Sequence, residues 1–154
     1  EWVILDMAIM GIGCITAPVY PSNTEEQVKY IVKHSESKVV FAEDQEQLDK
    51  MLVIWKDLPM VKKIVVIDKY YPRNLPNVIS LDGYRDLGQL HRGENTGKFE
   101  ERLKLVKPND IISFTYTSGT TGNPKAGMFN SKNVITVAKN LPEMLPTYRT
   151  DLGI

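Results

Sequence analysis

Two short apolar runs on either side of a helical pattern limit the possible folds more than any other feature of this sequence. Val39 to Phe41 and Ile64 to Ile67 have the length of strands and consist of β-branched and aromatic residues. Between them, apolar residues recur at helical spacing, at Leu48, Met51, Leu52 and Trp55. Asp44 precedes this pattern as an N-cap, and Pro59 follows it as a stop. The order strand, helix, strand predicts a βαβ unit and therefore an α/β fold with a parallel sheet.

The most apolar stretch, Trp2 to Tyr20, predicts a buried helix followed by a short strand at Ile15 to Val19. Its uncharged part contains Pro18 and is shorter than the about 20 residues that a membrane-spanning helix needs. We therefore expect no transmembrane span in this segment. Cys14 is the only cysteine, and its apolar neighbours predict a buried structural thiol rather than a nucleophile.

A second helix is predicted after Pro21, with two possible starts. Ser22 with Glu25, or Thr24 with Gln27, can form a capping box. The apolar stripe of this helix consists of Val28, Ile31 and Val32. His34 lies near the C-terminal end, where an imidazole suits the helix dipole, so we assign it no catalytic role.

The next segment predicts a short strand around Ile79 and a helix capped by Asp82. His91 ends this helix, and residues 93–98 form an exposed polar connector.

The last part predicts a hairpin followed by a helix. Ile111 to Tyr116 is the first strand of the hairpin, and Gly127 to Phe129 is the return strand. Asn130 or Ser131 caps the final helix. Pro142 and Pro146 are expected to close it.

The segment between these two strands is rich in glycine and hydroxyl residues and ends in a lysine. Glycines let backbone N–H groups approach an anion, hydroxyls add donors, and the ammonium supplies charge. Asn123 and Pro124 separate the second glycine from the lysine, which excludes the P-loop motif. A surface turn of similar composition is the other interpretation. The predicted phosphate-binding residues are Thr117, Ser118, Gly119, Thr120, Thr121, Gly122 and Lys125.

Phe114 to Lys125 resembles the phosphate loop of the adenylate-forming (AMP-binding) enzymes at every constrained position. Pro18-Val-Tyr20 and Tyr30-Ile-Val32 are similar to segments of the long-chain acyl-CoA synthetases, the fatty acid–CoA ligases of that superfamily. There are two departures. Ala126 and Gly127 exchange the family's usual order, and Ser131 stands where the family often has His.

The resemblance implies ATP-dependent activation of a fatty acid, with a long chain favoured, to an acyl-adenylate and then to acyl-CoA. ATP with its Mg²⁺, CoA and the fatty acid are the implied substrates and cofactors. It also implies mixed, partly parallel sheets flanked by helices within the large N-terminal domain. Residues 1–154 would be part of that domain, without the C-terminal domain and the main catalytic residues, and would be inactive alone.

Two alternatives remain open at this point. One is a non-catalytic nucleotide- or phosphate-binding module derived from the same fold, and the other is an adenylating ligase for a different carboxylic acid. A formal net charge of +0 gives no indication of a nucleic-acid partner. His34, His91 and Cys14 are too far apart in sequence for a recognisable metal motif. We expect an intracellular protein, although no targeting segment specifies its location and membrane association of a longer parent protein stays open.

Overall fold

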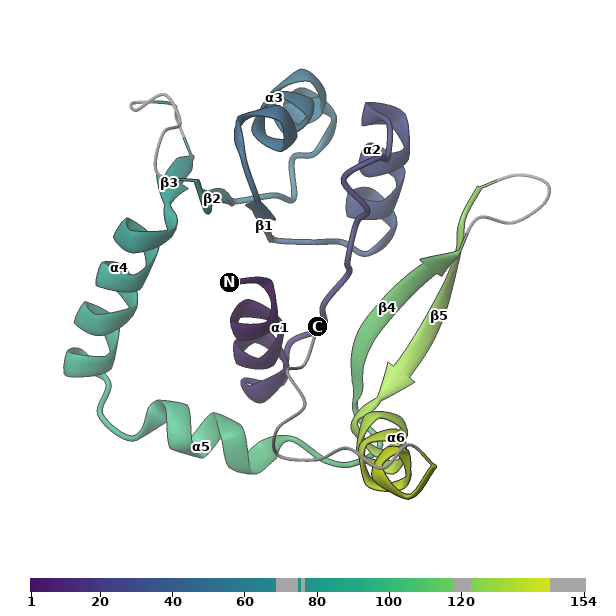
Figure 1. Cartoon of the computed structure of the whole chain (residues 1–154). Helices are drawn as coiled ribbons and strands as arrows, with labels where there is room; N and C mark the ends of the chain where they lie inside the picture. Colours follow the sequence, from purple (N-terminus) through teal and green to yellow (C-terminus); the bar gives the residue numbers. More distant parts are fainter. Residues whose placement is uncertain (69–74, 76, 118–122, 145–154) are drawn as a thin grey trace.

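The computed structural model describes residues 1–68, 75, 77–117 and 123–140, together with the backbone of 141–144. Figure 1 shows the order of the elements along the chain. The first half contains α1 (Trp2–Gly11), α2 (Glu25–His34), β1 (Val39–Ala42), α3 (Gln45–Ile54), the 3₁₀ turn η1 (Trp55–Asp57), β2 (Lys63–Val66) and β3 (Val78–Ser80). The second half contains α4 (Leu81–Glu94), α5 (Lys98–Leu105), β4 (Ile111–Thr117), β5 (Lys125–Asn130) and α6 (Ser131–Met144).

The predicted βαβ unit is confirmed. β1, β2 and β3 form a parallel sheet in that order, with Val40 opposite Ile64 and Ile64 opposite Val78. Helices α2 and α3 lie together beside this sheet (Figure 1). The main core lies between them and consists of Val28, Val32, Ala42, Leu48, Met51, Ile54, Leu58, Val61, Ile64 and Val66.

A second sheet consists of the antiparallel hairpin β4–β5, as predicted. The strand expected at Ile15 to Val19 is reduced to one parallel bridge, between Thr16 and Ser113. The Thr16 N–H donates to the Ile112 carbonyl at 2.9 Å, and the Phe114 N–H donates to the Thr16 carbonyl at 2.8 Å. Pro18 has no N–H to continue such a ladder, which explains why the pairing stops here.

The helix caps decide between alternatives that the sequence left open. Thr24 and Gln27 form the two-sided capping box of α2, so the Ser22 alternative is not used. The prediction that Asp82 caps α4 is wrong, because Ser80 is the N-cap and its hydroxyl accepts from the Gly83 N–H at 3.0 Å. At the start of α6, the Asn130 side chain accepts from the Asn133 N–H at 2.9 Å.

Two predictions about helix ends are wrong. The connector expected at 93–98 is shorter, because α4 continues through Gly93 to Glu94 and α5 begins at Lys98. Pro142 does not close α6, whose backbone stays helical to Met144.

The predictions of burial near the N-terminus are also wrong. α1 has no buried residue, and Cys14 is exposed. No described element packs over α1 and Cys14 closely enough to bury their apolar side chains. Trp2 on α1, for example, is 62% exposed. No helix in the described part of the chain is long and apolar enough to cross a membrane.

Candidate functional site

The hairpin brings the two ends of the predicted phosphate loop together. Thr117 is the last residue of β4, Lys125 is the first residue of β5, and the two lie directly opposite each other. Cross-strand partners have Cβ atoms about 5 Å apart and side chains on the same face of the sheet. Both residues are exposed. The other predicted ligands, Ser118, Gly119, Thr120, Thr121 and Gly122, lie outside the described residues.

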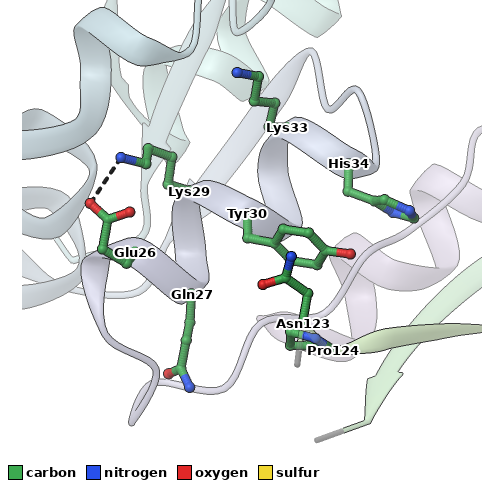
Figure 2. A pocket seen from close by; sticks show the side chains of 8 residues that line it. All are labelled: Glu26, Gln27, Lys29, Tyr30, Lys33, His34, Asn123 and Pro124. Carbon is green, nitrogen blue, oxygen red and sulfur yellow. Dashed lines mark hydrogen bonds and ion pairs between the residues drawn. The ribbon is translucent and has the colours of Figure 1, made fainter. Parts of the chain in front are cut away.

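A pocket of about 510 Å³ lies beside this hairpin. One side of the pocket is a face of α2, and the other is the segment that leads into Lys125 (Figure 2). Its lining residues are Glu26, Gln27, Lys29, Tyr30, Lys33, His34, Asn123 and Pro124. The α2 members recur at helical spacing, so they share one side of the helix.

Helix α2 therefore has two faces with different roles. Val28, Ile31 and Val32 are buried and fix the helix in the core. Tyr30 and His34, four residues apart, lie on the pocket face. The buried face holds the helix in the core. The pocket face is therefore a fixed surface next to the segment that leads into β5.

The cations near the pocket differ in their availability. Lys29 forms ion pairs with Glu26 at 2.8 Å and with Asp57 at 3.3 Å. The hydrogen bond to Glu26 is the main cause that raises the pKa of Lys29. Lys33 and Lys125 form no ion pair with any residue in the described ranges. No carboxylate in that part of the chain neutralises their charges.

An aromatic and imidazole cluster joins α2 to the end of β4. The His34 Nδ1 atom lies 2.8 Å from the Tyr116 hydroxyl oxygen. The His34 ring stacks on Tyr30 with centroids 5.5 Å apart and meets the Tyr116 ring edge-on at 5.7 Å. Burial, followed by the neighbouring Tyr30, raises the pKa of Tyr116, and a side-chain hydrogen bond with Ser35 opposes this shift.

The pocket face of α2 was not among the predicted site residues. Its signal in the sequence is the recurrence of polar and aromatic residues from Glu26 to His34, opposite the apolar stripe. That pattern is the same as for a helix face in contact with water, so it does not by itself indicate a site. Among the described residues, no group of three or more His, Cys, Asp or Glu side chains is arranged to hold a metal ion.

The chain resembles known enzymes over nearly its whole length. It is 32% identical to the long-chain-fatty-acid–CoA ligase ACSBG1 of Rattus norvegicus over 90% of this chain and 19% of that protein. It is 29% identical to the long-chain-fatty-acid–CoA ligase FadD15 of Mycobacterium bovis over 96% of this chain and 23% of that protein. The chain thus spans about a fifth of the length of these curated relatives.

Solved structures show the same fold. The anthranilate CoA ligase AuaEII matches with a TM-score of 0.68 and 23% identity, over 90% of this chain and 24% of that chain. VinN matches with a TM-score of 0.64 and 19% identity, over 97% of this chain and 33% of that chain. The family model described as AMP-binding enzyme matches residues 1–151. The chain therefore belongs to the AMP-binding enzyme family.

Proposed function

We propose that the protein carrying this chain activates a long-chain fatty acid with ATP, first to an acyl-adenylate and then to acyl-CoA. The observation that carries the proposal is the pairing of Thr117 with Lys125, which places a hydroxyl and an ammonium at the two ends of the glycine-rich segment, the ammonium having no ion pair within the described ranges. The named activity of the relatives at 32% and 29% identity supports the choice of a long-chain fatty acid.

In the first step the carboxylate attacks the α-phosphate of ATP, the bond to the β-phosphate breaks, and pyrophosphate leaves. In this proposal Lys125 neutralises charge that develops on the leaving pyrophosphate, and the Thr117 hydroxyl donates to a phosphate oxygen. Residues 118–122 supply further hydroxyl and backbone donors. Mg²⁺, which enters bound to ATP, offsets phosphate charge. In the second step the CoA thiol attacks the acyl carbonyl and AMP leaves.

The test is a pair of half-reaction assays on the full-length protein with Lys125→Ala. Adenylate formation, measured as pyrophosphate–ATP exchange, should fall by about 10²-fold, because a charged donor to the leaving group is lost. Thiolysis of a supplied acyl-adenylate by CoA should change much less, since pyrophosphate has already left. Lys125→Arg keeps the charge and should retain part of the exchange activity.

Lys104→Ala is the matched control, because Lys104 is exposed on α5 and forms no ion pair within the described part of the chain. It should leave both half-reactions unchanged. Equal losses in exchange and thiolysis for folded Lys125→Ala would contradict the phosphate-binding role. A wild-type protein that binds ATP but shows no exchange with any fatty acid would support a non-catalytic module instead.

A further inference from the structure

The hydrogen bond between His34 and Tyr116 joins two parts of the fold that are otherwise weakly linked. Within the described residues, His34 is the one member of α2 that hydrogen-bonds to the hairpin, and Ser35, the C-cap of α2, adds a side-chain hydrogen bond to the same Tyr116 hydroxyl. Tyr116 is 6% exposed whereas His34 is exposed, so this partly buried hydrogen bond lies at the boundary between the buried side of β4 and water. A buried hydroxyl that lost its partner would carry a desolvation cost, which makes this contact specific.

The position of Tyr116 makes this contact relevant to the phosphate loop. Tyr116 directly precedes Thr117, and its cross-strand partner is Ala126, the neighbour of Lys125. The same face of α2 also borders Asn123 and Pro124, the two residues before Lys125. Both strand ends therefore meet one helix face, which the core holds in place.

We propose that the His34–Tyr116 hydrogen bond fixes the strand ends that carry Thr117 and Lys125, which makes His34 a positioning residue for phosphate binding. The effect on ATP rests on the function proposed above, whereas the anchoring of the hairpin does not. Without the bond, the hairpin samples more orientations relative to α2. Phosphate binding must then restrict those orientations. Because this ordering costs conformational entropy, ATP binds less tightly.

Four variants of the full-length protein test this inference. Tyr116→Phe keeps the ring and removes the hydroxyl, and His34→Leu removes the nitrogen that faces it. The double variant measures whether the two changes act through one contact. His34→Asn is the rescue, because the amide atoms of Asn are attached to Cγ as Nδ1 is in His. Tyr20→Phe, at a tyrosine that is 67% exposed, is the control.

The first measurement is the KM for Mg·ATP in pyrophosphate–ATP exchange. Each single variant should raise it about 3- to 10-fold, the effect expected for one hydrogen bond. The double variant should be no worse than either single variant, and His34→Asn should recover part of the loss. Thiolysis should stay within about twofold of the wild-type rate, since pyrophosphate is absent from that step. Additive effects, or equal losses in thiolysis, would overturn the positioning role.

The second measurement does not depend on catalysis. Amide hydrogen exchange of β4 and β5 should become faster in Tyr116→Phe and His34→Leu, but not in Tyr20→Phe. Unchanged exchange in the hairpin would overturn the inference whatever the enzyme activity. Failure of the proposed function has a different result: no pyrophosphate–ATP exchange in the wild type and no effect of Lys125→Ala on ATP binding, with the loss of hairpin protection still observed.

Discussion

The hydroxyl of Tyr116 illustrates how one buried polar atom can serve both stability and site geometry. Its ring lies on the buried side of β4, and its hydroxyl oxygen lies within hydrogen-bond distance of His34 at the end of α2. Edge-on contact between the two rings adds a directional interaction to the hydrogen bond. A phenolate at this place would lose hydration, so burial favours the neutral form.

This environment predicts a late ionisation of Tyr116 in an alkaline titration. Burial raises its pKa above the ordinary value of 10.0. The unfolded chain therefore releases this proton at lower pH than the folded chain. The contribution of the neutral Tyr116 to folding stability is fully present below the unfolded-state pKa of about 10. It is lost as the pH rises from there through the higher pKa of the folded state. The measurement is phenolate absorbance in wild type and Tyr116→Phe. The absorbance difference between the two proteins reports the ionisation of Tyr116, and its midpoint should lie above pH 10 while the protein is folded. A midpoint below pH 10 would contradict the assignment.

Some residues of the site could be predicted from the sequence and others could not. Thr117 and Lys125 lie within one contiguous motif, so their proximity follows from a strand, a tight connection and a return strand. The contact between His34 and Tyr116 joins positions 82 residues apart. No local pattern encodes that separation, because it depends on how α2 and the hairpin pack together.

Local signals predicted most elements, and the errors have a common cause. The strands and the caps at Thr24 and Asp44 follow from periodicity and capping chemistry, both of which act within a few residues. α1 was expected to be buried because it is apolar on all sides, yet burial needs a second surface to cover it. Ser80 is the cap because strand β3 ends there with an extended backbone and the helix begins at Leu81, which places Asp82 inside the first turn.

The choice of capping box in α2 gives a prediction for this element. Thr24→Ala should destabilise the helix by about 1 kcal/mol, because the Gln27 N–H loses the Thr24 hydroxyl that accepts its hydrogen bond. Ser22→Ala should change stability by less than about 0.5 kcal/mol, since its box is not formed. Urea unfolding of the full-length protein, followed by amide exchange within α2, measures both. Equal effects of the two substitutions would show that the helix starts earlier than Thr24.

The molecule as a whole is more open than a compact domain of its mass. The chain exposes 11577 Å², whereas a compact monomer of 17.5 kDa exposes about 7,900 Å². Large apolar side chains are exposed on α1, α5 and α6, for example Ile4, Phe99 and Val137. Helices α4 and α5 run along the edge of the structure (Figure 1). The chain spans about a fifth of the length of its curated relatives, and these apolar faces have no covering element among the described residues.

We therefore expect the isolated 154-residue chain to self-associate. Ile4 and Met7, one helical turn apart on α1, are 63% and 62% exposed, and apolar patches of this kind drive association in water. The double variant Ile4→Lys, Met7→Glu should lower the associated fraction in sedimentation velocity and reduce binding of a hydrophobic dye, without changing net charge. Glu43→Lys with Lys56→Glu, also neutral in net charge and at exposed positions, is the control and should leave association unchanged. A wild-type chain that stays monomeric at high concentration and unfolds in one sharp, reversible transition would show that its exposed apolar faces need no partner.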